Sequence, residues 1–206
     1  MKFVLLLLAF SVSLATSAAQ AQQAGDHIAI TPAQAVDVKK GQIEVLEFFW
    51  YRCGHCFNLE PDLEAWSKKL PKNVILKRVP AILNPDWTAM ARVYYALDAI
   101  GMVDKLHGKV FDAIHVQGMD LTAPETFFDW AVTQGIDRKK ITNAYHSFNV
   151  ETRVMRAQQL TRSYQLTGVP AIAVNGKYLT SAGLTGGHRE LFQTVDALIA
   201  QELKRK

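Results

Sequence analysis

The two cysteines of this 206-residue sequence lie in one tetrapeptide, Cys53-Gly54-His55-Cys56. A disulfide across two intervening residues closes a very small loop, and the stabilisation that a bridge provides grows with the logarithm of loop length. Such a bridge adds little to the stability of a folded domain. We therefore expect its value to be chemical, as a dithiol that is oxidised and reduced. Two cysteines also exclude a framework of several structural disulfides.

A structural zinc site is the competing use of a Cys-x-x-Cys motif. It would need a second pair of ligands, but the sequence has no second cysteine pair, and its histidines show no His-x3-5-His spacing. We therefore predict no metal and no cofactor.

The motif falls between a predicted strand and a predicted helix. Residues 43–50 (IEVLEFFW) form a β-branched and aromatic run typical of a strand buried on both faces. After Cys56, apolar residues recur at helical intervals as far as Pro71. If Cys53 caps this helix, free backbone N–H groups and the helix dipole favour its thiolate. Cys56 then lies one turn inward on the same face, where it is more shielded.

Two neighbouring side chains can act on the Cys53 sulfur. His55 lies between the cysteines and Arg52 precedes them, so either can stabilise a thiolate on Cys53. Only the reduced form has a thiolate, so a lower Cys53 pKa makes the disulfide a stronger oxidant. Arg52 has an alternative interpretation, as a solvated surface charge without a role.

A second marker lies more than a hundred residues further along the chain. Pro170 cannot donate to a strand ladder, so it fits the first position of the apolar strand that follows it. Asn175-Gly176 then predicts a hairpin turn into a further strand over residues 177–179. Local sequence does not reveal whether the Val169–Pro170 bond is cis.

Three segments carry a resemblance to a known family: EFFWYRCGHC at 47–56, GVPA at 168–171 and VNGKY at 174–178. Together they resemble the DsbA family of bacterial periplasmic thiol:disulfide oxidoreductases, and the likeness extends over nearly the whole mature chain. The resemblance implies an α/β protein, a thioredoxin fold with an inserted all-helical domain. It also implies a redox-active disulfide of nucleophilic Cys53 and buried Cys56, with a cis Pro170 opposite and Val169 offering backbone groups to a substrate.

The sequence departs from this family at one position of the motif. The usual dipeptide between the cysteines is Pro-His, whereas Gly54-His55 is the pair found in protein disulfide isomerases. Glycine allows more backbone freedom at the start of the helix. Because His55 is retained, we still expect an oxidising protein, with isomerase-like behaviour as the alternative.

Glu47 interrupts the apolar strand before the motif. On period-2 alternation it shares a face with Val45 and Phe49, where an ionised carboxylate is costly. One hypothesis, which the resemblance supports, is that Glu47 lies beneath the disulfide and exchanges a proton with Cys56. The other is that Glu47 is paired with a cation near the next strand. The candidate cations are Lys72, Lys77 and Arg78.

The chain divides into a leader and a globular part. Lys2, the apolar run at 3–15 and Ala19-Gln20-Ala21 predict a signal peptide over residues 1–21, cleaved near Ala21, because the run is too short to span a membrane. We expect thioredoxin-fold segments at 22–83 and 166–206, with the inserted helical domain at 84–165. The predicted helices, in order, cover roughly 85–100, 102–116, 123–134, 138–147 and 150–165, with a last helix at 189–203. Thr122 is expected to cap the third, and Gly101 and Gly135 to end the first and third.

These observations predict a periplasmic enzyme that donates its Cys53–Cys56 disulfide to newly exported, reduced polypeptides through a mixed-disulfide intermediate. By resemblance, a DsbB-type, quinone-linked membrane oxidoreductase reoxidises it. We expect a monomer. The formal net charge of +4 falls to +3 when Lys2 is removed with the signal peptide, which is too small to indicate nucleic-acid binding. The alternatives are an isomerase or reductase, or a binding module such as a peptide-holding chaperone or a metal carrier.

Overall fold

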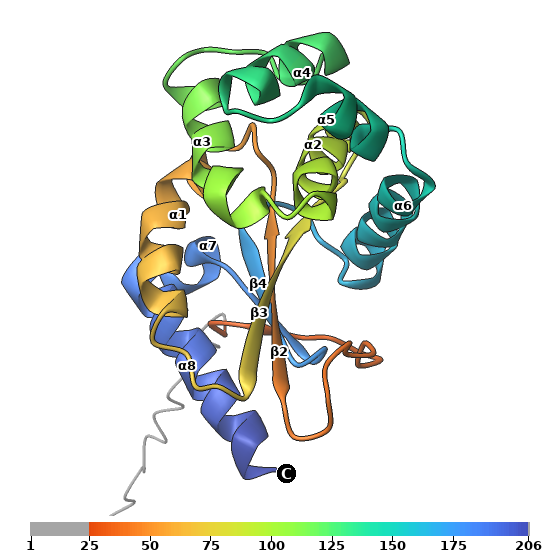
Figure 1. The fold of residues 1–206 in the computed structure, drawn as a ribbon. Helices are drawn as coiled ribbons and strands as arrows, with labels where there is room; N and C mark the ends of the chain where they lie inside the picture. Colours follow the sequence, from red (N-terminus) through yellow and green to blue (C-terminus); the bar gives the residue numbers. More distant parts are fainter. Residues whose placement is uncertain (1–24, 206) are drawn as a thin grey trace, which may run out of the picture.

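The computed structural model describes residues 25–205, as a mixed β-sheet flanked and capped by helices (Figure 1). The signal peptide expected at residues 1–21 lies outside the described residues. Within residues 25–205, no helix has both the length and the apolar character needed to cross a membrane. The fold class is the one expected, a thioredoxin fold with a helical insertion.

The sheet has five strands in the order β1-β5-β4-β2-β3. Their bounds are β1 (Ile28–Ala29), β2 (Ile43–Phe49), β3 (Val74–Pro80), β4 (Ala171–Val174) and β5 (Tyr178–Thr180). β2 runs parallel to β3 and antiparallel to β4, and β5 pairs antiparallel with β4 and β1. The register places Glu47 of β2 opposite Arg78 of β3 and Ile172 of β4. The predicted strands at 43–50, at 170–174 and at 177–179 are confirmed to within one residue.

β2 is buried along its whole length because apolar layers cover both faces of the sheet. On one face, Ile43 and Val45 pack in a core with α1 (Gly54–Ser67) and α8 (His188–Lys204). On the other face, Leu46 and Phe48 join a larger core with the helices between β3 and β4. Alternation along residues 43–48 therefore supplies both layers, and Phe49 at the end of β2 also lies in the larger core.

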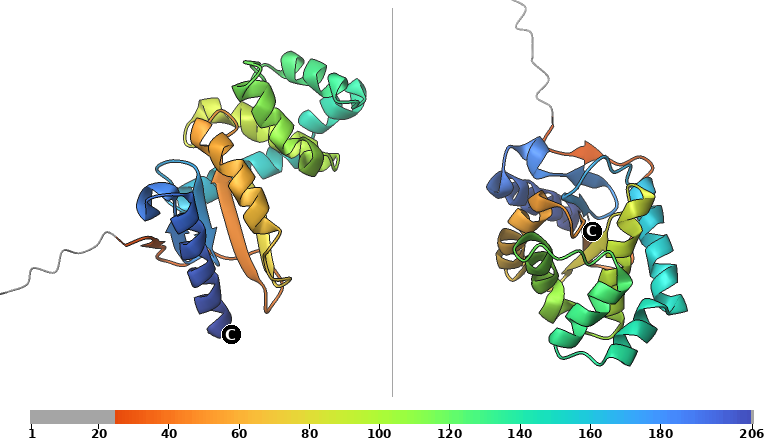
Figure 2. Two further views of the ribbon diagram at one scale, coloured as in Figure 1. Left: turned by 90° about the vertical axis from the view of Figure 1, so that its left-hand side faces the viewer. Right: turned by 90° about the horizontal axis from the view of Figure 1, so that it is seen from above.

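The remaining helices are α2 (Thr88–Ala99), α3 (Val103–His115), α4 (Pro124–Thr133), α5 (Arg138–Tyr145), α6 (Phe148–Ser163), α7 (Ala182–Thr185) and the 3-10 turn η1 (Pro85–Trp87). Figures 1 and 2 show α2 to α5 gathered beyond the ends toward which β2 and β3 point, with α6 returning along the side of the sheet. The first cysteine of the motif lies at this same end, because α1 begins just after β2.

The structure confirms two of the predicted helix ends and corrects the sequence-based prediction at two other points. Gly101 and Gly135 have φ of +72° and +83° and follow the C-cap residues of α2 and α4, as helix-ending glycines do. Thr122, however, does not cap α4. The N-cap is Ala123, which makes no capping hydrogen bond, and the Thr122 hydroxyl bonds Asp120 instead. The short α7 was not predicted, because four residues are too few for a periodic pattern.

The Asn175-Gly176 hairpin is confirmed, with φ of +51° and +70° at the two turn residues. Glycine is also required at position 176 for a steric reason that is separate from the turn. A Cβ on this residue would lie 2.1 Å from the Gln34 carbonyl oxygen. The glycine therefore permits the turn and lets the 30–34 segment pass close by.

This close approach predicts the effect of Gly176→Ala on stability, and Gly101→Ala is the matched control. Gly101→Ala faces open space at a positive φ, so we expect it to lower the free energy of unfolding by about 1–2 kcal/mol. Gly176→Ala adds overpacking against Gln34 and should lose about 1–3 kcal/mol more. Urea unfolding of both variants measures the difference, and equal losses would show that the contact with Gln34 is not restrictive.

Candidate active site

Cys53 is the N-cap residue of α1. Its backbone is extended, with φ −87° and ψ 114°, and its Sγ accepts a hydrogen bond from the Cys56 backbone N–H at 3.3 Å. The sulfur therefore occupies the position that a capping oxygen usually takes at a helix start. Both cysteines are free thiols in this structure. The predicted capping role of Cys53 is confirmed.

The two sulfur atoms have opposite electrostatic environments. The hydrogen bond from the Cys56 side chain, with further hydrogen bonds from the backbone of Cys56 and His55, lowers the pKa of Cys53 to about 6. Cys56 is fully buried, and this desolvation raises the pKa of its thiol far above the usual range. Near neutral pH the reduced pair is therefore a thiolate at Cys53 and a thiol at Cys56.

The residues beside the cysteines contribute unequally. The positive charge of His55 lowers the pKa of Cys53, although less than the hydrogen bonds do. Arg52 is exposed and acts instead on Asp120, whose pKa its charge helps to lower. The interpretation of Arg52 as a solvated surface charge is the one that the geometry favours.

Glu47 is buried in the centre of the sheet with 1% of its surface exposed. Its Oε2 lies 3.2 Å from Nε of Arg78, so the predicted pairing with a cation near the next strand is confirmed for Arg78. Lys77 instead pairs with Glu44 at 3.1 Å. Burial raises the pKa of Glu47 to about 8, despite the opposing effect of Arg78. Glu47 in turn acts electrostatically on Cys56, whose pKa its charge raises.

Pro170 and Val169 lie on the other side of the Cys53 sulfur. The Val169–Pro170 peptide bond is cis, and the Cys53 thiol points to the Val169 carbonyl oxygen at 3.5 Å. The structure therefore brings together residues that lie more than a hundred positions apart in the sequence. Their meeting point leaves the Val169 backbone beside the more reactive sulfur.

A groove of about 440 Å³ begins at this meeting point. His55, Val169 and Pro170 line its near end, and Leu184 and His188 lie among its other lining residues. Two of the exposed large apolar side chains, Ile28 (50%) and Leu184 (38%), line the groove. An apolar channel beside a reactive sulfur suits an extended polypeptide segment.

The structure adds two residues that the sequence did not single out. Glu60 is buried on α1 and its Oε1 accepts from Nη2 of Arg78 at 2.6 Å. Glu60 lies four residues after Cys56, about one helical turn further along α1. Helical spacing from the buried Cys56 could therefore have predicted that Glu60 is buried as well. His107 of α3 lies 3.4 Å from Glu60. Nothing in the local sequence indicated this contact, because it depends on how α3 packs against α1.

Within the described residues, no group of three or more His, Cys, Asp or Glu side chains has a geometry suited to holding a metal ion.

Comparisons with known proteins agree with this geometry. Residues 69–198 match a family model described as a DSBA-like thioredoxin domain. The thiol:disulfide interchange protein DsbA of Burkholderia cepacia is 37% identical over 211 residues, covering 100% of both chains. That of Azotobacter vinelandii is 40% identical over 171 residues, covering 83% of this chain and 80% of the relative. The crystal structure of Pseudomonas aeruginosa DsbA superposes with a TM-score of 0.82 at 36% identity, covering 86% of this chain and 92% of that one.

The environment of Cys53 predicts different effects for two substitutions of Cys56. Cys56→Ala removes the side-chain donor that contributes most to the low pKa of Cys53, so this pKa should rise by about one unit or more. Cys56→Ser retains a donor and should keep the pKa low. The pH dependence of thiolate absorbance or of alkylation by iodoacetamide measures both. If the two variants titrate alike, the backbone N–H groups alone stabilise the thiolate.

Glu47 predicts a pH dependence of stability. Its pKa is raised from the usual 4.5 to about 8, so the folded protein binds this proton more tightly than the unfolded chain does. The resulting stabilisation is full below about pH 4.5 and is lost as the pH rises toward 8. The Glu47→Gln profile should lack this decline, so the difference between the two unfolding profiles should change steadily between about pH 4.5 and 8. Parallel profiles would show that Glu47 does not titrate in this range.

Proposed function

The chain belongs to the DsbA-like family of thioredoxin-fold thiol:disulfide oxidoreductases, and from this premise we propose that it is a periplasmic dithiol oxidase for newly exported polypeptides. The observation that carries the proposal is the contrast between Cys53, with a pKa of about 6, and the buried Cys56 thiol. Stabilising a thiolate favours the reduced form of the enzyme, so the oxidised form gives up its disulfide readily.

The proposed reaction has two steps. A substrate thiolate attacks Cys53 Sγ, the Cys53–Cys56 bond breaks, and Cys56 Sγ leaves with the electron pair and takes up a proton. A second substrate thiolate then attacks the substrate sulfur of the mixed disulfide, and Cys53 leaves as a thiolate. The substrate loses two electrons to form its disulfide, and the enzyme gains them as a reduced cysteine pair.

The proposed role of Glu47 is to supply the proton that Cys56 takes up and to accept it again on reoxidation. The support is its burial, its electrostatic effect on Cys56 and a pKa raised to about 8, which keeps the carboxyl protonated near neutral pH. His55 assists by its charge on Cys53, and the substrate segment pairs with the backbone of Val169 while Pro170 contributes no competing N–H.

We infer the location and the partners of the enzyme from the family to which the chain belongs. We place the mature enzyme in the periplasm after cleavage near Ala21, as a monomer. Its partners are reduced exported polypeptides and a DsbB-type, quinone-linked membrane oxidoreductase that reoxidises it. We also retain the division into thioredoxin-fold segments at 22–83 and 166–206 and an inserted helical domain at 84–165.

Gly54 bears on the balance between oxidation and isomerisation. It is the first residue of α1, and a Cβ at this position would have no neighbour within 4 Å. Packing therefore does not select glycine here, and the residue affects only the backbone freedom of the helix start. The environment of Cys53, on which the oxidising character depends, is built from Cys56 and His55 instead.

The test uses the oxidised mature protein and a reduced peptide with two cysteines. We expect the wild-type protein to convert the peptide to its disulfide, and Cys53→Ala to lose this activity entirely because no disulfide can form. Equilibration with a glutathione redox buffer then gives the reduction potential. A potential as reducing as that of thioredoxin would contradict an oxidase, and peptide-holding activity that survives Cys53→Ala would indicate a chaperone.

A further inference from the structure

Four segments of the chain meet at the end of the sheet opposite the cysteines. β2 and β3 are parallel, so both begin at this end, where the Ile43 N–H donates to the Asn73 carbonyl oxygen at 2.8 Å. The hairpin between β4 and β5 lies beside them, because the Asn175 N–H donates to the Glu44 carbonyl oxygen at 2.7 Å. The Asn175 side chain in turn donates to Glu202, near the end of α8, at 2.6 Å. The start of β2, the α1–β3 connection, the hairpin and the end of α8 therefore lie together.

These segments, which we call the basic end, carry an excess of positive charge. The basic end comprises residues 37–44, 68–77, 175–178 and 202–205, which contain nine Lys and Arg against three Asp and Glu, a formal charge of +6. The other described residues contain twelve Lys and Arg against sixteen Asp and Glu, a formal charge of −4. A chain with a small net charge is therefore strongly polarised along its sheet.

The three acidic side chains of the basic end are already paired. Lys77 lies 3.2 Å from Asp37 and 3.1 Å from Glu44. Lys177 lies 2.6 Å from Glu202. The other seven cations are exposed to solvent, and they are Lys39, Lys40, Lys68, Lys69, Lys72, Lys204 and Arg205.

These exposed cations have few partners within the protein. Arg205 lies 3.4 Å from Glu202, whereas the six lysines have no ion-pair partner within residues 25–205. Helix dipoles account for the cations that directly follow α1 and α8, since both helices end here. They do not account for Lys39 and Lys40, which precede β2, or for Lys72, which lies beyond the last turn of α1. The accumulation of lysines at this end therefore has no explanation within the fold.

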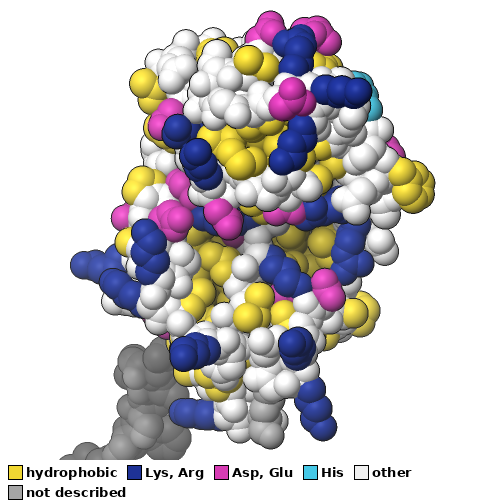
Figure 3. Space-filling model, in the orientation of Figure 1, with side chains coloured by type: hydrophobic (Ala, Val, Ile, Leu, Met, Phe, Trp, Pro, Cys, Tyr) yellow, Lys and Arg dark blue, Asp and Glu magenta, His cyan; other side chains and the backbone are white. Residues whose placement is uncertain are grey.

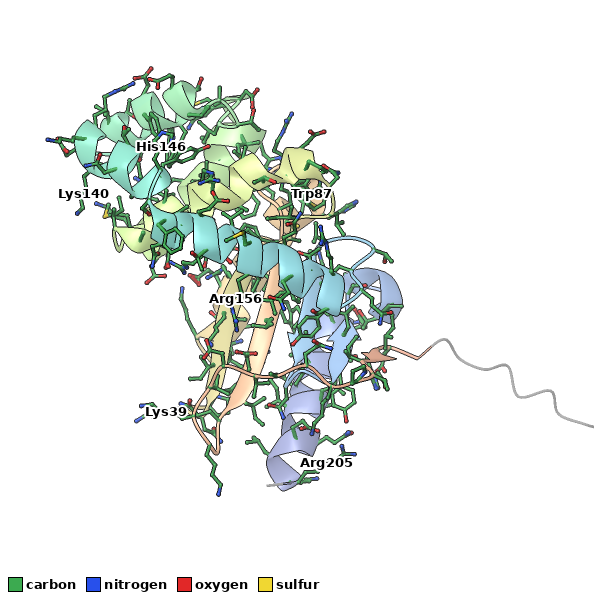
Figure 4. All side chains as sticks on the ribbon, turned by 90° about the vertical axis from the view of Figure 1, so that its right-hand side faces the viewer. Lys39, Trp87, Lys140, His146, Arg156 and Arg205 are labelled. Carbon is green, nitrogen blue, oxygen red and sulfur yellow. The ribbon has the colours of Figure 1, made fainter. Side chains whose placement is uncertain are left out.

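The basic end and the reactive cysteines lie at opposite ends of β2. A strand rises about 3.3 Å per residue, so the seven residues of β2 separate the two by roughly 20 Å. Figure 3 shows Lys and Arg side chains spread over the lower end of the molecule, and Figure 4 labels Lys39 and Arg205 at this end. A partner bound to the basic end leaves Cys53 accessible.

The composition of the basic end indicates the kind of partner. Eight of its nine cations are lysines, whereas nucleic-acid recognition uses arginine forks and exposed rings on which bases stack. The only aromatic residue in these segments is Tyr178, which is 9% exposed. Lysines are mobile point charges on flexible stems, which suit a broad anionic surface without a fixed geometry. Anionic phospholipid headgroups form such a surface and attract lysine clusters.

We propose that the basic end binds the anionic phospholipid headgroups of a membrane surface. The proposal rests on the proposed periplasmic location, which places the protein beside membranes, and not on the redox chemistry. In the bound orientation Cys53 faces away from the lipid, toward the water through which exported polypeptides approach. Reoxidation by a membrane partner needs the opposite orientation, so the binding has to be reversible, as a screened attraction between exposed charges is.

The test measures how much of the oxidised mature protein floats with lipid vesicles in a density gradient at low salt. We expect binding to vesicles made of equal parts of phosphatidylglycerol and phosphatidylcholine, and little binding to phosphatidylcholine alone. Raising the salt concentration should release the protein. Equal binding to both kinds of vesicle, or no binding to the anionic ones, would overturn the proposal.

A triple variant removes three of the unpaired lysines from the basic end. Lys40→Gln, Lys72→Gln and Lys204→Gln together should lower the partition coefficient for the anionic vesicles about 100-fold, because each lysine near the surface contributes about a fivefold change. The three side chains are exposed, so the variant should fold and should oxidise the two-cysteine peptide in solution at the wild-type rate. Vesicle binding equal to that of the wild type would overturn the proposal.

The matched control removes the same net charge elsewhere. Lys105→Gln, Lys139→Gln and Lys140→Gln change exposed lysines of the inserted helices, and Figure 4 shows Lys140 at the opposite end of the molecule from Lys39. This variant should bind the anionic vesicles nearly as well as the wild type. Comparable losses in the two triple variants would show that binding follows the total charge, and would overturn a role for the basic end.

Three further measurements test the orientation and the partner. Iodoacetamide should alkylate Cys53 of the reduced protein as fast on anionic vesicles as in solution, and protection of Cys53 would place the wrong end against the lipid. Single-stranded DNA that binds as tightly as the vesicles, and is equally weakened by the basic-end variant, would show a general polyanion surface instead. If the wild-type protein does not oxidise the peptide in solution, the proposed function fails, whereas the vesicle result stands or falls separately.

Discussion

The chemistry of this protein depends on the unequal solvation of two sulfur atoms that lie one helical turn apart. Cys53 ends an extended segment and receives N–H groups from the first turn of α1, whereas Cys56 is the first fully buried residue of that helix. A charge is stable on the first sulfur and unstable on the second. This difference persists only if the start of α1 keeps its place between the sheet and the Val169 carbonyl oxygen, 3.5 Å from the Cys53 thiol.

The helices between β3 and β4 hold the segment that precedes α1 in that place. His115 of α3 donates from Nε2 to the Tyr51 carbonyl oxygen at 2.8 Å, while His107 of the same helix meets the Tyr51 hydroxyl. Trp50 stacks on Trp87 with ring centroids 4.1 Å apart, and Trp87 is labelled in Figure 4. The backbone of Trp50 in turn accepts from the Cys53 N–H at 2.9 Å. The inserted helices are therefore part of the framework that positions Cys53.

Local rules predicted several features of the structure correctly, although the capping box expected at Thr122 does not form. The apolar run of β2, the Asn175-Gly176 turn and the capping place of Cys53 each follow from residues within a few positions of one another. The groove and the Glu60–His107 contact do not. The groove lies between His55 of α1, the residues around Pro170 and the β5–α7 connection, and the Glu60–His107 contact joins α1 to α3. The environment of Glu47 could be predicted only in part. Alternation predicted its burial, but choosing Arg78 over Lys77 required the register of β3, in which Arg78 and not Lys77 lies opposite Glu47.

Stability alone does not explain the buried Glu47–Arg78 ion pair. Replacing a buried ion pair with apolar side chains of similar volume is often neutral or stabilising, so packing does not explain why β2 carries a carboxyl at its centre. In the proposed reaction, the buried sulfur of Cys56 gains a proton when the enzyme is reduced and loses it on reoxidation. The proposed donor of that proton is Glu47, a carboxyl buried in the sheet with a pKa raised to about 8.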